Sequence, residues 1–246
     1  STSVFEKEFV LTDPVSIRNF LKLELDDSPA APISQTSYTA QERDRSEKLL
    51  SQFLSTQNIN YQDKQEAEIQ EILSSFCCTK DKDIEDFLLT KAVTFEKLGK
   101  ARTYLVCSKE QLENSFCSSP LIIYGYISIA LKVLSLSPDF SNRLRKELDG
   151  FSAKLHGFPV NAFPCYLIGQ LSRNSNVPKS SLSGEKLLSF AYDIIQSAVD
   201  VVGGRYMMIE CSKHTKLIQF YKNNHFQELN PSIYSQQPMV QMIRKL

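Results

Sequence analysis

The sequence lacks any apolar run that approaches the ~18 to 20 residues needed for a membrane-spanning helix. Its first fourteen residues also lack a basic segment followed by an apolar core, which a secretory signal would contain. We therefore expect a protein without a membrane segment, and the cytoplasm is its default location.

The sequence has no excess of charge of either sign. Its 28 Lys and Arg residues balance 28 Asp and Glu residues, so no long-range field would attract a polyanion. A nucleic acid partner would need a local basic patch. The small basic face formed by Arg143, Arg145 and Lys146 is the candidate.

Cysteine and histidine are present without the spacing of a metal site. The six cysteines include no C-x-x-C pair, and several lie in apolar stretches, where a free thiol behaves as a small core residue. We therefore expect reduced thiols. His156, His214 and His225 occur in unrelated contexts, which predicts no metal site. Cys211 with His214 is a weak candidate for a nucleophile and base, because no orienting residue or oxyanion motif accompanies them.

Residues 1–68 differ in composition from the rest and are predicted to form a helical extension. They are rich in charge, Ser and Gln, and residues 26–37 form a Pro/Ala/Ser stretch typical of a linker. Periodic apolar residues predict one helix from Asp13-Pro14 to Leu25 and another over residues 39–57. These helices would pack on the main body or bind a partner.

Residues 69–246 alternate between strand and helix patterns, which predicts a mixed α/β domain with one central sheet. We expect strands at 69–78, 101–108, 121–134, 162–172, 205–212, 226–230 and 239–243, and helices at 81–99, 137–151, 184–202 and 213–226. The strands at 101–108 and 121–134 should be antiparallel neighbours. The later strand, helix and strand should form a parallel unit, whose ligands bind at the carboxyl ends of the strands, here near Leu171 to Gly184.

Six short motifs in this region resemble the GNAT family of acyl-CoA-dependent N-acyltransferases, with the closest similarity to a bacterial, toxin-like branch. Their order and spacing carry the resemblance more than any single motif. They are Asp86-Phe87-Leu88, Ala101 to Val106, Gly125 to Leu131, Pro164 to Leu171, Gly184 to Leu188, and Phe220-Tyr221 with Phe226. The resemblance implies a mixed GNAT-type sheet with flanking helices.

The resemblance also implies a binding site for acetyl-CoA as cosubstrate. The strand equivalent to residues 166–172 would splay from its neighbour and pair with the pantetheine arm, and the amide near Leu171 would polarise the thioester carbonyl. Tyr221 would protonate the departing thiolate. The crossing and the helix start would hold the diphosphate; the implied cofactor-binding residues are Leu171, Arg173, Lys179, Ser180, Ser181, Leu182, Ser183 and Gly184.

The glycine loop of the family is degenerate in this chain. Lys179, Ser180, Leu182 and Gly184 align where the pattern has Gln or Arg followed by three glycines. A left-handed conformation at Ser180 and Leu182 would cost about 1 to 2 kcal/mol each. Either the loop follows another path, or serine hydroxyls and the Lys179 ammonium offset the loss.

Two further departures lie near the expected site. Gln170 replaces an Arg that is common in the related branch, which removes a positive charge. His225 replaces the Gly that precedes Phe226, and we expect Asn224 to supply the left-handed turn instead.

Three side chains have two interpretations each. Tyr221 is either the acid or a packing residue beside Phe220. Arg102 follows a predicted helix and begins a predicted strand, which favours a structural salt bridge over a substrate contact. Glu210 is either a base for the incoming amine or the ion-pair partner of Lys213 or Lys216.

The leading hypothesis is an acetyl-CoA-dependent N-acetyltransferase that transfers acetyl directly to a primary amine. The toxin-like branch suggests aminoacyl-tRNA as acceptor, and a protein or a small amine is equally open, as is a homodimer. The alternative is a catalytically degenerate GNAT-like binding or regulatory module that uses residues 1–68 to engage a protein partner.

Overall fold

The computed structural model describes residues 15–17, 61–108, 121–229 and 239–246. The described helices do not include one long and apolar enough to span a bilayer. In chain order the elements are β1 (Val15–Ser16), α3 (Tyr61–Ser74), α4 (Lys82–Asp86), η1 (Phe87–Lys91), α5 (Ala92–Lys97), β2 (Arg102–Cys107), β3 (Ile123–Ser135), α7 (Asn142–Asp149), β4 (Lys154–Leu155), β5 (Phe158–Pro159), β6 (Ala162–Arg173), α8 (Gly184–Val202), β7 (Tyr206–Ser212), α9 (Thr215–Asn223), β8 (Gln227–Glu228) and β9 (Met239–Lys245).

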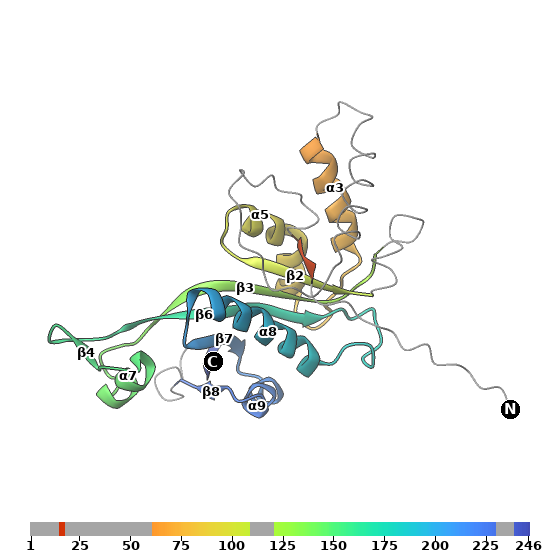
Figure 1. The fold of residues 1–246 in the computed structure, drawn as a ribbon. Helices are drawn as coiled ribbons and strands as arrows, with labels where there is room; N and C mark the ends of the chain where they lie inside the picture. Colours follow the sequence, from red (N-terminus) through yellow and green to blue (C-terminus); the bar gives the residue numbers. More distant parts are fainter. Residues whose placement is uncertain (1–14, 18–60, 109–120, 230–238) are drawn as a thin grey trace.

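One mixed sheet of seven strands forms the centre of the molecule, in the order β1-β2-β3-β6-β7-β9-β8 (Figure 1). Strands β6 and β7 are parallel, and all other neighbours are antiparallel. The antiparallel pair β2–β3 and the parallel β6–α8–β7 unit are therefore confirmed. The expected mixed central sheet with flanking helices is confirmed as well.

Helices cover both faces of the sheet (Figure 1). Helices α8 and α9 pack in one core cluster with inward side chains of β3, β6 and β7, such as Ile127, Ile168 and Ile209. Helices α3, η1 and α5 pack in a second cluster over β2 and β3. A third cluster holds α7 against the far end of the β3–β6 pair.

The predicted strand at residues 69–78 is wrong. Residues 69–74 continue helix α3, and 76–78 have no regular structure. Ile69 and Leu73 are both buried and lie four residues apart, so the apolar period is that of a helix face packed on the second cluster. The expected boundary between residues 68 and 69 falls inside this helix.

The helix at 81–99 is confirmed as three consecutive segments that include the π-turn η1, and Gly99 ends it with φ 65°. Helix α7 begins later than predicted, because Ser141 rather than Ser137 is the N-cap and accepts a hydrogen bond from the Leu144 amide. The remaining strands and helices of the domain lie near their expected positions.

Strand β1 and the β4–β5 hairpin were not predicted, since each strand has only two residues and leaves no periodic signal. Of the helix expected from Asp13-Pro14 to Leu25, only residues 15–17 are described, and Val15–Ser16 form strand β1 instead. The rest of this expected helix lies outside the described residues. The helix expected at 39–57 also lies outside them.

Candidate active site

The parallel strands β6 and β7 separate before either of them ends. Their pairing covers only Tyr166 to Ile168 with Met207 to Ile209. Strand β6 nevertheless continues to Arg173 and β7 to Ser212. Within the described residues, β6 therefore has no strand partner on its β7 side from Gly169 onward. This opening is called the split below.

A β-bulge marks the start of the split. Ser128 pairs with Gln170 and Ile129 with Ile168, so Gly169 is an extra residue in β6 without a partner in β3. A bulge of this kind bends its strand and increases the local twist. The bend coincides with the level at which β6 leaves β7.

The hydrogen-bond register of β6 directs part of its backbone into the split. The Asn174 amide donates to the Tyr124 carbonyl at 2.8 Å. Because antiparallel ladders alternate, Ser172 and Gln170 also bond toward β3, whereas the N–H and C=O groups of Leu171 and Arg173 point away from it. Both N–H groups and the Leu171 carbonyl are available to a ligand that lies in the split, whereas the Arg173 carbonyl accepts from the Ser172 hydroxyl at 3.2 Å.

The loop from Asn174 to Ser183 avoids the strain that its lack of glycine could cause. Among the described residues other than glycine, only His156 and His225 have positive φ, so Ser180 and Leu182 are not left-handed. The strain expected for a left-handed Ser180 and Leu182 therefore does not arise. Leu182 is buried, and a Cβ placed on Gly125 would lie 2.8 Å from its Cδ2 atom. Arg173 Nη1 donates to the Leu182 carbonyl at 3.2 Å, which connects the C-terminal end of the loop to the end of β6.

Helix α8 begins directly after this loop. Ser183 is its N-cap, and the hydroxyl accepts from the Lys186 amide at 3.0 Å. The amides of Gly184 and Glu185 have no acceptor inside the helix, and they carry its positive dipole end. A Cβ on Gly184 would lie 3.3 Å from the Phe220 ring, which is a tight contact. The helix start can therefore receive an anion, with exposed Lys179 and Ser180 before it.

Tyr221 lies on α9 in the core cluster that joins α8 to the sheet. Its ring packs edge-on against the rings of Phe220 and Phe226, with centroid distances of 5.1 Å and 5.5 Å. Burial, and secondarily the nearby Cys211 thiol, raises the pKa of the Tyr221 phenol. Cys211 belongs to the part of β7 that does not pair with β6, and the buried Tyr221 phenol lies near its thiol.

Glu210 occupies the opposite face of β7, level with the split. It binds Lys132 Nζ at 2.6 Å and accepts from Gln241 Nε2 at 2.7 Å. The prediction that Glu210 pairs with Lys213 or Lys216 is wrong, because its partner Lys132 lies across the sheet on β3. Desolvation raises the pKa of Glu210, but the Lys132 and Gln241 hydrogen bonds outweigh it and lower the pKa overall. A carboxylate held ionised in this way is a poor general base.

Several other candidates have structural surroundings. Arg102 forms the expected salt bridge, with Glu96 at 3.0 Å. Burial raises the pKa of Cys211 to about 11, so it is a thiol at neutral pH rather than a nucleophile. At the end of α9, His225 itself is left-handed with φ 67°, whereas Asn224 has φ −98°, which corrects the expectation for Asn224.

The expected basic face on α7 is incomplete. Arg143 and Lys146 are exposed, but Arg145 is only 2% exposed. Its guanidinium donates to the carbonyls of Ser137, Pro138 and Val160 and to the Asn161 side chain. Arg145 is thus a structural residue of the third cluster.

Two features of this region were missed from the sequence, the Gly169 bulge and the buried Asn174. Asn174 follows the last residue of β6 and is 2% exposed. A polar residue directly after a long apolar strand was the available signal. Nothing in the sequence indicated what its amide would bind.

No family model matches the chain, and no curated protein does. Solved structures do match. A tyrosine-to-phenylalanine mutant of the toxin AtaT has a TM-score of 0.50 at 18% identity, and the match covers 70% of this chain and 82% of that one. A tyrosine-to-phenylalanine mutant of KacT has a TM-score of 0.50 at 16% identity, over 69% of this chain and 85% of that one.

A further structure, described as a bacterial toxin, has a TM-score of 0.50 at 12% identity over 69% of this chain and 80% of that one. Similarity at these identities concerns the fold. The topology and the matched structures agree: the described chain has the mixed α/β fold of the GNAT acyltransferases.

Proposed function

We propose that the protein is an acetyl-CoA-dependent N-acetyltransferase. The observation that carries the proposal is one of position. The split, the outward-facing backbone of Leu171 and Arg173, and the start of α8 all lie at the same end of β6. An extended ligand with amide groups at one end and a diphosphate at the other fits this order, and acetyl-CoA has that composition.

The backbone of β6 would hold the extended part of the ligand. The Leu171 carbonyl and the Arg173 N–H group can pair with the amides of a pantetheine arm as a neighbouring strand would. Acetyl-CoA supplies the activated acetyl group as a thioester. In this arrangement the Leu171 amide donates to the thioester oxygen, where negative charge develops during attack by the amine.

The loop and α8 would hold the diphosphate. The Gly184 and Glu185 amides provide the donors, and Lys179, Ser180 and Ser181 add side chains on the solvent side. Ser183 contributes as the N-cap that exposes these amides, since its hydroxyl is already engaged. Leu182 contributes only through its backbone, because its side chain is buried in the core.

Tyr221 would supply a proton to the leaving group. A nitrogen–carbon bond forms between the amine and the acetyl carbon, and the carbon–sulfur bond breaks. The phenol proton goes to the departing thiolate, the amine releases its own proton to water, and water returns a proton to the tyrosinate. A tyrosine phenol holds its proton at neutral pH, and burial raises the pKa of Tyr221 further, which makes it a weaker acid.

The acceptor is proposed as a primary amine, with aminoacyl-tRNA, protein and polyamine as the classes to test. Incubation of the full chain with radiolabelled acetyl-CoA and each class separately should transfer label to one of them. Absence of transfer to every class, despite measurable binding of acetyl-CoA, would overturn the enzyme assignment.

That outcome would favour the alternative, a GNAT-like module that binds without turnover. The glycine-poor loop is the observation that supports it, because Lys179 to Ser183 bring bulky side chains to the place where the family has bare backbone. In this case residues 1–68 become the candidate partner-binding segment.

A further inference from the structure

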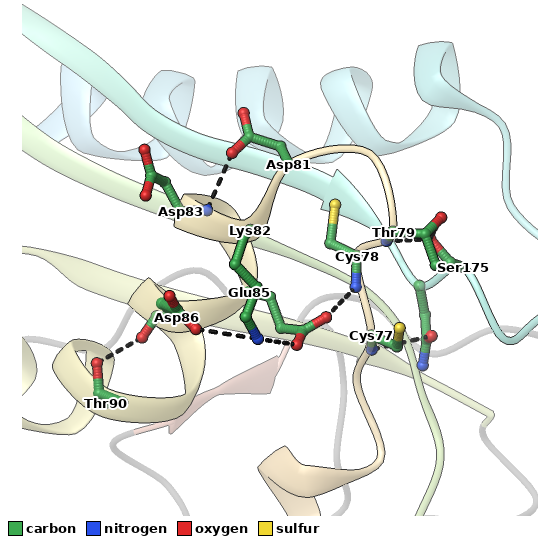
Figure 2. A network of polar contacts seen from close by, with 11 residues as sticks. Cys77, Cys78, Thr79, Asp81, Lys82, Asp83, Glu85, Asp86, Thr90 and Ser175 are labelled. Atoms are coloured by element: carbon green, nitrogen blue, oxygen red, sulfur yellow. Dashed lines mark hydrogen bonds and ion pairs between the residues drawn. The ribbon is translucent and has the colours of Figure 1, made fainter.

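The connection between α3 and α4 is hydrogen-bonded to the end of β6 and to the first residues of the loop. Residues 75–79 form no regular structure of their own. Their polar groups bond instead to residues almost one hundred positions later in the chain. Figure 2 shows Cys77, Cys78 and Thr79 facing Ser175 on one side and Glu85 on the other. We call this set of contacts the joint.

Asn174 is the centre of the joint. Its Oδ1 atom accepts from the Cys77 amide at 3.2 Å and from the Asn176 amide at 2.9 Å. Its Nδ2 atom donates to the carbonyls of Ser75 at 2.8 Å and Ile123 at 2.7 Å. The side chain thereby uses both donors and both acceptor positions while it is 2% exposed.

Neighbouring residues extend the joint on both sides. The Ser175 amide donates to the Cys77 carbonyl at 2.7 Å, and the Ser175 hydroxyl accepts from the Thr79 amide at 3.0 Å. The Sγ atom of Cys78 lies 3.5 Å from the Ser172 hydroxyl. The Cys78 amide donates to the Glu85 carboxylate at 2.6 Å, which continues the contacts into α4.

The joint fixes one end of the loop, and the start of α8 fixes the other. The segment from α3 to α5, residues 61–97, is called the helical lobe. Residues 174 and 175 are held by this lobe, whereas Leu182 and Ser183 are held by Arg173 and by the N-cap. Only residues 176–181 lie between these two anchors. A loop that cannot use glycine to approach a diphosphate depends more strongly on being held in place before the ligand arrives.

We propose that Asn174 is a positioning residue, which holds the loop for the diphosphate and makes the affinity for acetyl-CoA depend on the helical lobe through the joint. The part of this inference that concerns affinity rests on the proposed function. The part that concerns the position of the loop rests on geometry alone. Coupling between two sites is reciprocal, so acetyl-CoA must also protect residues 75–79.

The test compares three variants of the full chain by hydrogen exchange and by calorimetric titration with acetyl-CoA. Asn174→Asp places an oxygen against the Ser75 and Ile123 carbonyls, and Ser175→Ala removes only the acceptor for Thr79. Thr90→Ala is the control, because it removes a hydrogen bond to the Asp86 carbonyl in the same lobe, away from the joint.

Both joint variants should speed exchange in residues 75–79 and in residues 176–183, while α8 beyond residue 190 keeps its protection. Asn174→Asp should weaken acetyl-CoA binding by about tenfold or more, the equivalent of one buried hydrogen bond. Ser175→Ala should weaken binding by a smaller factor, and Thr90→Ala should match the wild type. In the wild type, acetyl-CoA should slow exchange in residues 75–79.

Unchanged exchange of residues 176–183 in Ser175→Ala would overturn the inference, even if Asn174→Asp fails to fold. Faster exchange in both segments with unchanged acetyl-CoA affinity would also overturn it. If the wild type does not bind acetyl-CoA, the proposed function fails by itself, and the exchange arm alone decides whether the joint holds the loop.

Discussion

At the scale of single residues, Tyr221 connects the packing of α9 with the proposed chemistry. Its ring is held by Phe220 and Phe226, and within the described residues its hydroxyl has no hydrogen-bond partner. Packing and catalysis are therefore separable, because loss of the hydroxyl leaves the ring contacts in place.

Tyr221→Phe should lower kcat by about 10² to 10⁴ fold while the affinity for acetyl-CoA stays nearly unchanged. The reason is that the phenol acts only when the thiolate departs. Steady-state rates of CoA release and a calorimetric titration provide the two readouts. Tyr192→Phe is the matched control, because Tyr192 is a partly buried tyrosine on α8, and this variant should retain activity. An equal loss of turnover and affinity in Tyr221→Phe would refute the acid role.

Glu85 gives a residue-scale prediction about pH. Hydrogen bonds from Lys82 and from the Cys78 amide lower its pKa from 4.5 to about 2, against the opposing effect of desolvation. A carboxyl with a lowered pKa in the folded state binds fewer protons there than in the unfolded state. Its contribution to stability is therefore present above pH 4.5 and is lost as the pH falls toward 2.

Glu85→Gln should make the free energy of unfolding less dependent on pH between about 4.5 and 2 than in the wild type. Urea unfolding at several pH values in this window measures the effect. Glu147→Gln, at an exposed position of α7, should leave the wild-type dependence in place. The assignment fails if the Glu85 variant and the wild type lose stability in parallel.

At the scale of elements, the loop between β6 and α8 is held by a buried side chain. Leu182 belongs to the core cluster that contains Leu187, and its Cδ2 atom lies close to Gly125. A glycine at position 182 would therefore remove a core side chain.

Leu182→Gly should lower the free energy of unfolding by at least the ~2 to 5 kcal/mol typical of Leu→Ala in a core. Urea unfolding measures this loss directly. Ser180→Gly, at an exposed position of the same loop, should change stability by about 1 kcal/mol or less. A Leu182→Gly variant as stable as the wild type would show that this side chain does not support the core.

Most elements of the domain could be predicted because their periodicity is local. The stripe of α8 and the apolar runs of β3 and β6 are readable within ten to twenty residues. Residues 69–78 misled the prediction because Ile, Leu, Phe and Cys suit a strand and a buried helix face equally well. The sequence gives no indication that α7 starts at Asn142, since Ser137-Pro138 is an equally good helix start.

The missed parts of the site depend on contacts between distant segments. The Asn174 amide bonds to Cys77, 97 residues earlier, and the Gly169 bulge is defined only by the register with β3. Ser128 shows the same limit, because its hydrogen bond to Thr103 requires the sheet to be formed. The candidate residues Leu171, Tyr221 and Gly184 came from the family resemblance, and their proposed roles remain predictions.

At the scale of the whole molecule, the two faces of the sheet have different covers. Helices α3, η1 and α5 lie over β2 and β3 on one face, and α8 and α9 lie on the other face (Figure 1). The joint at Asn174 connects the first set of helices to the loop that precedes α8. The proposed site is thus linked to the helices of both faces, and a ligand in the split would stabilise the whole domain.

The central claim is that the split and the start of α8 together bind acetyl-CoA despite the missing glycines. Calorimetric titration of the full wild-type chain with acetyl-CoA tests it most directly. We expect saturable heat with one site per chain and a micromolar dissociation constant, which corresponds to a binding free energy of about −8 kcal/mol. Absence of heat at millimolar acetyl-CoA, together with an unchanged Tm, would contradict it.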